Sequence, residues 1–195
     1  MAFTWQYNKS SLFLIQKHLE IRIKALPVLK SKETALRQEV KKNKYLLETM
    51  VADYKSALDK ADDITYLCSE LDPSLIKVEN VESDIISIAG VKVPELSKIV
   101  FRKKTFNLFI HPFWFADGVN FLEKMITMKF KIEFIRKRIE LLEKARKKTT
   151  QKVNLYEKNQ IPEFNEAILK IKRFLDDEEN LSKSAQKILK SKSNI

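Results

Sequence analysis

The sequence contains very little glycine, proline and cysteine. Of its 195 residues, two are glycine, five are proline and one is cysteine. A sheet-rich fold with many tight turns needs far more turn residues, so this composition argues against one. Gly90 and Gly118 cannot build a glycine-rich phosphate loop, which excludes nucleotide binding through such a loop. The single Cys68 cannot form an intramolecular disulfide, which favours a reducing compartment.

Histidines and long apolar runs are also scarce. His18 and His111 are the only histidines, and with one cysteine they lack the ligand spacing of a zinc site. We expect both to be structural or solvated, and we expect no catalytic residue, no metal site and no cofactor. No apolar run reaches the length of a membrane-spanning helix, and "MAFTWQYNKS" lacks the apolar stretch of a signal peptide. These features favour the cytoplasm.

Charged residues, in contrast, make up 32% of the chain, a composition typical of long helices and coiled coils. Apolar residues follow a seven-residue repeat over 9–71, and fifteen of its eighteen core positions are apolar. Such a repeat predicts one long coiled-coil helix. Asn8 or Ser10 is a candidate cap at its start, and Asp72–Pro73 is a candidate stop. The core positions are Leu12, Ile15, Leu19, Arg22, Leu26, Leu29, Glu33, Leu36, Val40, Asn43, Leu47, Met50, Tyr54, Ala57, Ala61, Ile64, Cys68 and Leu71.

Pro27 interrupts this first helix. A proline inside a helix removes one backbone hydrogen bond and costs about 3 kcal/mol. Two interpretations stay open. One is a bend that serves function, and the other is a kink absorbed by packing or a helix that starts only after Pro27.

A second long helix is predicted over 113–190. Pro112 precedes it, where a first-turn proline is tolerated. The register of its apolar stripe shifts between Tyr156 and Phe164, beside Pro162, which predicts a local change in the supercoil. The stripe comprises Met125, Met128, Ile132, Ile135, Ile139, Leu142, Val153, Tyr156, Phe164, Ile168, Ile171, Leu175, Leu181, Ala185 and Ile188.

Residues 72–112, between the two helices, are rich in Ile and Val and partly alternate in polarity. They predict an antiparallel β-hairpin with Ala89–Gly90 at or near its turn, or at a bulge. Pro94 confines its own stretch to an edge strand or a strand end. The aromatic residues that follow are expected to pack between the hairpin and the helix ends: Phe106, Phe109, Phe113, Trp114 and Phe115.

Two long amphipathic helices joined by a compact element bury their stripes by running antiparallel. The predicted fold class is therefore mainly α: a long antiparallel two-helix coiled coil with a short β-hairpin knob at the helix-connecting end. We expect 1–195 to form a single elongated domain, in which the last ten or so residues of the second helix extend past the first as a single-helix tip.

The net charge of +11 raises nucleic acid or an anionic membrane surface as candidate partners. Much of the positive charge lies in 131–152, and the interpretation as a solvated helix face competes with that as a nucleic-acid surface. The apolar residues between these cations stand at helical spacing, which favours packing over base stacking. The candidate basic face comprises Arg136, Lys137, Arg138, Arg146, Lys147 and Lys148.

Three stretches resemble the D subunit of the V-type and archaeal-type rotary ATPases. They are "VLKSKETALRQEV" at 28–40, "IAGVKVP" at 88–94 and "KTTQKVNLYEKNQIPEFNEAILKIKRFLDDEE" at 148–179, and they occur in the order of that family. The stretch "VNLYEKNQIP" has fewer apolar residues than the usual "VNALEYVVIP", and Pro27 is also unusual. These departures indicate a divergent bacterial member.

The resemblance implies a non-catalytic central-stalk rotor that couples ATP hydrolysis or synthesis to ion translocation. Its implied partners are the hexamer of catalytic and non-catalytic nucleotide-binding subunits, the F subunit of the stalk and the subunit that caps the membrane ring. It implies a location in the cytoplasm, peripheral to the membrane, without insertion into it. Kinks at Pro27 and Pro162 would supply the asymmetry that an axle needs.

Two contact regions are expected. The first is the hairpin, with Ile88, Gly90, Val91, Val93 and Pro94, because a segment that only joins two antiparallel helices could be far shorter than 72–112. The interpretation of the hairpin as a mere connector stays open. The second is a rotor–stator contact at the tip and kinks, with Pro27, Lys30, Pro162, Phe164, Leu181 and Ile188.

Two other functions remain as alternatives. A basic coiled-coil protein that binds nucleic acid through 131–152 predicts an affinity that falls steeply with salt. A scaffold rod predicts no nucleotide-binding ring as partner.

Overall fold

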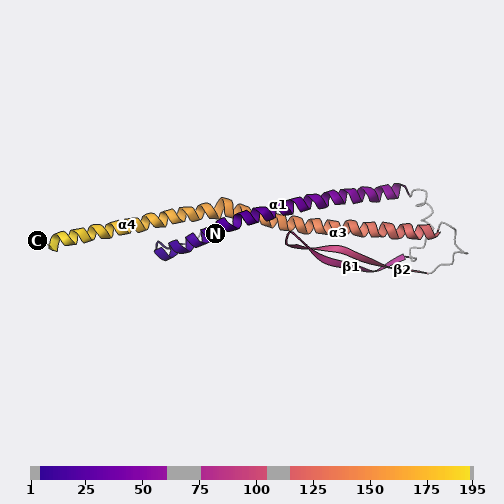
Figure 1. Cartoon of the computed structure of the whole chain (residues 1–195), viewed down its shortest axis with the longest axis horizontal. Coiled ribbons are helices and arrows are strands. Elements are labelled where there is room, and N and C mark those ends of the chain that lie inside the picture. The colour runs from indigo at the N-terminus through magenta and orange to yellow at the C-terminus, as the bar shows by residue number, and fades with distance from the viewer. Residues whose placement is uncertain (1–4, 61–75, 105–114, 194–195) are drawn as a thin grey trace. The chain divides into compact units, whose positions relative to one another are not determined.

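The computed structural model describes residues 5–60, 76–104 and 115–193. The chain forms two compact units, Met1–Glu33 with Lys148–Ile195 (unit 1) and Thr34–Lys147 (unit 2). Both are mainly helical, and the hairpin belongs to unit 2 (Figure 1). The predicted fold class, mainly α with two long helical segments and a short antiparallel hairpin, is confirmed. The prediction of a single domain over 1–195 stays a prediction.

Helix α1 spans Lys9–Asp59 and begins at an asparagine cap. The backbone N–H of Ser11 donates to Asn8 Oδ1 at 2.6 Å, so of the two predicted candidates Asn8 is the cap. Pro27 lies inside the helix, which rules out the interpretation of a helix that starts after it. Lys60 is in a turn, and the predicted continuation to 71 and stop at Asp72–Pro73 lie outside the described residues, as does Cys68.

The predicted heptad repeat is confirmed over the described helix. All fourteen predicted core positions from Leu12 to Ala57 are buried or half-buried. Its three polar members each make a hydrogen bond: Arg22 with Gln160, Glu33 with Thr150, and Asn43 with the carbonyl of Glu39. The three polar residues at core positions of the repeat therefore have hydrogen-bond partners.

The predicted hairpin is also confirmed. Strand β1, Ile76–Ile88, pairs antiparallel with β2, Val91–Lys103. Ala89 (φ 50°) and Gly90 (φ 73°) form the turn, and positive φ at both positions is the pattern of a type I′ hairpin turn. Pro94 lies opposite Ile85, where the alternation of an antiparallel ladder gives a non-hydrogen-bonded pair and leaves its nitrogen on the free edge.

The second helical segment starts at Phe115 and contains a π-helix where the shift in register predicted a local change in the supercoil. Helix α3 spans Phe115–Asn154, a π-helix η2 spans Leu155–Gln160, and α4 spans Ile161–Ser193. The backbone N–H of Ile161 donates to the carbonyl of Tyr156, five residues back. The π-helix ends two residues before Pro162, whose missing N–H would break an α-helix there. The predicted role of Pro112, and His111, lie outside the described residues.

Unit 1 has an apolar core between α1 and α4. Ile15 packs with Phe164, Ala167 and Ile171, which are 6%, 2%, 0% and 0% exposed. As the residue number in α1 increases, the residue number of its partner decreases. The pairs are Ile15 with Phe164, Arg22 with Gln160 and Glu33 with Thr150. The two segments of unit 1 are therefore antiparallel.

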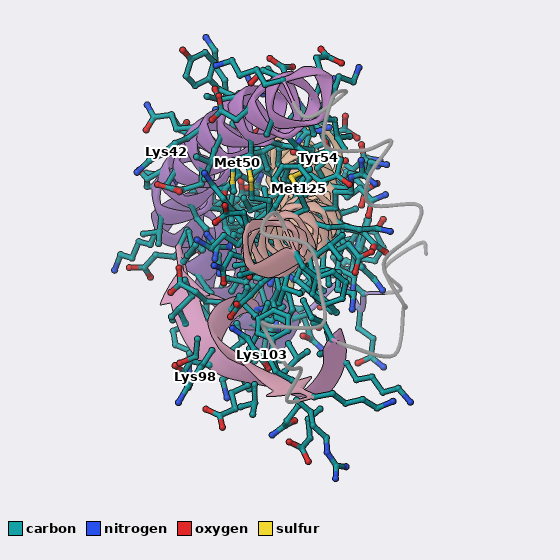
Figure 2. The ribbon with its side chains drawn as sticks, turned by 90° about the vertical axis from the view of Figure 1, so that its right-hand side faces the viewer. Lys42, Met50, Tyr54, Lys98, Lys103 and Met125 are labelled. Carbon is teal, nitrogen blue, oxygen red and sulfur yellow. The ribbon has the colours of Figure 1, made fainter. Side chains whose placement is uncertain are left out.

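Unit 2 has a core to which three elements contribute. Leu36 and Val40 of α1, Leu142 of α3 and Val93 of β2 form one buried cluster. Figure 2 shows Met50 and Tyr54 of α1 and Met125 of α3 between the two helices, while Lys42 projects outward. The turn end of the hairpin packs beside Leu36 and Leu142, and Lys103 at its far end pairs with Glu123 of α3, so the hairpin lies along the helices of unit 2. Of the predicted aromatic cluster only Phe115 is described, and it is buried; Phe106, Phe109, Phe113 and Trp114 lie outside the described residues.

Candidate functional site

The last part of α4 is exposed in the described part of unit 1, and only its first residues, up to Ser182, border a groove that Lys9 and Leu12 also line. The packing ends near Leu175, which borders the core, and Phe174, whose ring centroid lies 5.0 Å from that of Tyr7. Every residue of α4 from 176 to 192 is exposed, and Figure 1 shows α4 continuing past the start of α1. We call this segment the tip.

The tip carries large apolar side chains at helical spacing. Leu181 is 72% exposed and Ile188 is 58% exposed, and Ala185 between them lies on the same face. A surface helix normally turns such a stripe towards a core. The tip residues predicted to make contacts, Leu181 and Ile188, are therefore accessible to a partner.

The kink residues predicted to make contacts differ in their exposure. Pro27 and Pro162 are exposed, and Lys30 reaches across to η2, where its Nζ lies 2.6 Å from Glu157 Oε1. Phe164, in contrast, is only 2% exposed and lies in the core of unit 1. Phe164 can thus support a contact surface but has little surface to contribute itself.

Arg22 makes cross-helix contacts that the sequence did not predict. Its Nε donates to Gln160 Oε1 at 2.6 Å, and its guanidinium carbon lies 4.6 Å from the ring centroid of Phe164 and 5.7 Å from that of Tyr156. Two features of the sequence could have pointed to these contacts: a cation at a core position of the heptad repeat, and the shift in register between Tyr156 and Phe164. Periodicity alone cannot show that Arg22 meets this shift, because it does not identify the partner residue in the other helix.

The hairpin residues predicted as a contact surface mostly face the core of unit 2. Val93 is fully buried, Ile88 and Val91 pack against the same cluster, and Pro94 is half-buried. Gly90, at the turn, is exposed. The hairpin therefore uses these apolar residues to attach to the helices.

The six predicted basic residues differ in their surroundings. Arg138 is turned to the hairpin, with its Nη2 3.2 Å from Glu95 Oε1 and its side chain only 12% exposed. Arg146 borders a groove against α1, whereas Arg136, Lys137, Lys147 and Lys148 are exposed. One of the six cations is thus used within unit 2 and is not available to a nucleic acid.

The groove beside Arg146 contains a cross-helix ion pair. Lys44 Nζ lies 2.6 Å from Glu143 Oε1. The hydrogen bond from Lys44 holds the pKa of Glu143 below its ordinary value of 4.5, and the charges of Lys44, Lys147 and Arg146 act in the same direction, whereas partial burial opposes them. The groove is lined by Arg37, Val40, Lys41, Lys44, Glu143 and Arg146, among others.

The described ranges 5–60, 76–104 and 115–193 offer neither a metal site nor a membrane span. No three His, Cys, Asp or Glu side chains there are grouped so as to hold a metal ion. No helix in these ranges has the length and apolar content needed to cross a bilayer.

The sequence model of the family of ATP synthase D subunits matches residues 11–191. That range takes in nearly all of α1 and α4, together with the hairpin, α3 and η2. The chain belongs to the ATP synthase D-subunit family. The resemblance carried by 28–40, 88–94 and 148–179 is thereby confirmed.

Curated relatives of the ATP synthase D-subunit family match nearly the whole chain. The D subunit of the V-type ATP synthase of Borreliella burgdorferi is 29% identical over 188 residues, covering 94% of this chain and 92% of the relative. The protein of that name from Chlamydia muridarum is 28% identical over 197 residues, covering 98% and 97%. A Chlamydia trachomatis relative of the same name is 28% identical, covering 86% and 85%.

Proposed function

We propose that this chain is the central-stalk rotor of a V-type ATP synthase, a non-catalytic subunit that couples nucleotide turnover in a catalytic hexamer to ion translocation. Membership of the D-subunit family and the names of the bacterial relatives support this function over a nucleic-acid-binding or scaffold protein. Its partners are the nucleotide-binding subunits, the F subunit of the stalk and the subunit that caps the membrane ring. The protein acts in the cytoplasm at the membrane surface.

The observation that carries the proposal is the exposed tip. A helix of seventeen exposed residues, 176–192, with an apolar stripe at Leu181, Ala185 and Ile188, extends from a packed two-helix unit. Isolated helices of this length are marginal in water, so the stripe calls for a partner. The cavity of a ring of nucleotide-binding subunits can enclose such a tip on all sides.

The axle role requires no reaction at the tip. Its acidic run, Asp176–Asp177–Glu178–Glu179, points around the helix, because neighbouring residues on a helix diverge. These carboxylates therefore do not converge as a catalytic pair would. The tip instead acts by contacting the ring of nucleotide-binding subunits. Because the tip is asymmetric, it contacts the subunits differently and favours one nucleotide site at a time.

A variant with Leu181→Asp and Ile188→Asp tests the proposal. Two charges on the stripe should cost several kcal/mol on entry into an apolar site and should reduce binding to the purified hexamer by about 100-fold or more. Binding is measured by surface plasmon resonance, and stimulation of ATP hydrolysis is measured on the same samples.

The matched control is Gln186→Asp, which places a charge on an exposed tip position away from the stripe. It should bind within about threefold of the wild type, since an exposed surface substitution changes free energies little. Equal binding by the stripe variant and the control would contradict the proposal. A chain that recovers no nucleotide-binding subunit from cells that express the complex would contradict it too.

A further inference from the structure

Arg22 connects α1 to the π-helix and to the start of α4 in unit 1. In η2 its Nε donates to Gln160 Oε1, and its guanidinium lies over the ring of Tyr156. In α4 its guanidinium carbon lies over the ring of Phe164, beyond Pro162, at 4.6 Å. Its Nη1 also donates to the carbonyl of His18, 2.9 Å away, which fixes the guanidinium to α1. We call these contacts the Arg22 clasp.

The π-helix needs such support. Leu155–Gln160 places one extra residue in the helical path, with the i to i−5 bond from Ile161 N–H to Tyr156. π-helices are rare and recur mostly as single-turn bulges at functional sites. The other cross-helix links of this region are weaker, because Lys30 and Glu157 are about half exposed and Thr150 Oγ1 lies 3.3 Å from Glu33 Oε1.

The extra residue has a geometric consequence for α4. One residue corresponds to a turn of about 100° in an α-helix of 3.6 residues per turn. If η2 became an α-helix, α4 would have to turn by that amount, or α1 would lose its contact with Phe164, Ala167 and Ile171. The π-helix therefore sets which side of α4 faces α1, and with it the side on which Leu181 and Ile188 lie.

We propose that Arg22 is a positioning residue, which holds the π-helix in place and thereby sets the rotational position of the tip. Its contacts join the bulge to the helix that follows, since they include two residues of η2 and one of α4. That Arg22 positions the tip within this chain follows from these contacts. That this position matters for the rotary motor rests on the proposed function.

Hydrogen exchange of the full-length chain tests the clasp directly. Arg22→Ala should speed amide exchange in 156–161 by about tenfold, the order expected for losing a hydrogen bond to a charged group. Arg22→Lys should restore this only in part, because lysine keeps the charge but lacks the planar fork. The control is Lys24→Ala, which removes a cation that pairs with Glu20 on the same helix and is 75% exposed. Unchanged exchange in Arg22→Ala would overturn the proposal.

A deletion separates positioning from general stabilisation. Removal of the exposed Asn159 takes out the extra residue, so the segment can become an α-helix while α4 keeps its side towards α1. In this background Arg22→Ala should no longer speed exchange in 156–161 beyond the deletion alone. The same acceleration in both backgrounds would mean that Arg22 only stabilises the helix pair.

The rotational position of α4 relative to α1 in unit 1 is measured by the yield of a chemical cross-link. Lys9 and Ser182 line the same groove of unit 1, so cysteines at these positions, with Cys68→Ser, should react with a short bis-maleimide. Arg22→Ala should lower the yield severalfold and Lys24→Ala should not. An unchanged yield would contradict the assignment of rotational position to Arg22.

The last comparison measures how strongly each variant stimulates ATP hydrolysis in the reconstituted complex. Arg22→Ala should reduce this stimulation, as the variant with Leu181→Asp and Ile188→Asp should. A loss with the stripe variant alone would overturn the motor consequence of the clasp and leave the proposed function standing. No loss with either variant would overturn the proposed function, whereas the exchange and cross-linking results would still decide the clasp.

Discussion

The two units bury their helices by different means. In unit 2 the hairpin places Val93 against Leu36 and Leu142, and all three side chains are fully buried. In unit 1, whose described residues include no strand, long polar side chains cross between the helices, foremost Arg22 to Gln160 and Lys30 to Glu157. Two helices alone cannot enclose a wide apolar core. In unit 1 the aliphatic parts of long cationic side chains and the aromatic rings beside them cover the apolar surface, as the hairpin does in unit 2.

This difference bears on the proposed role of Arg22. In a closed apolar core few other packings are possible, because adding or removing a single methylene group already changes stability. Polar contacts over a π-helix can hold one specific arrangement that is less deeply buried. Under the proposed role of Arg22, the rotational position of the tip in unit 1 depends on such individual polar contacts.

The largest effect on stability is expected in the core of unit 2. Leu142→Ala should lower the free energy of unfolding by about 2–5 kcal/mol, because it leaves a cavity in a fully buried site. Urea denaturation followed by circular dichroism measures it. Leu141→Ala, at a position 38% exposed, should cost clearly less. Equal losses would break the comparison, since they would mean that the hairpin-covered core is not closed.

The turn of the hairpin should give an intermediate effect. Gly90→Val places a β-branched residue at a φ of 73° and should cost about 1–2 kcal/mol in the free energy of unfolding. Lys92→Val, at an exposed position of β2, serves as control and should cost less. If the hairpin covers unit 2 as described, Gly90→Val should also speed amide exchange near Leu142. Exchange that stays slow there would limit the role of the hairpin to its own strands.

The smallest effect concerns the ion pair between Lys44 and Glu143. The folded-state pKa of Glu143 lies below its ordinary value, so the pair contributes stability above pH 4.5 that is lost as pH falls through the lowered folded-state value. Glu143→Gln should therefore lower stability at neutral pH by at most about 1 kcal/mol and flatten its loss in acid.

Denaturant midpoints measured from neutral pH to below pH 4.5 test this, with Glu140→Gln as control at an exposed position of the same helix. An identical acid profile for wild type and Glu143→Gln would show that this pair adds nothing to unit 2. That result would sharpen the contrast, since cross-helix polar contacts would then matter in unit 1 alone.

The sequence determined the local structure. The heptad repeat predicted fourteen positions from Leu12 to Ala57 that are all buried or half-buried, the pair Ala89–Gly90 located the turn, and the shift in register next to Pro162 marked the place where the π-helix lies. Periodicity, turn chemistry and the missing N–H of proline act within a few residues, so they can be read along the chain.

Tertiary structure decided which of these residues meet. Only the fold brought Val93 into a helix core, turned Arg138 to Glu95 and placed Arg22 between Tyr156 and Phe164. These pairs are separated by 43 residues or more in the chain, beyond any local signal. The physical reason is that a helix repeat states which face is buried, while the neighbour on that face depends on how the chain returns.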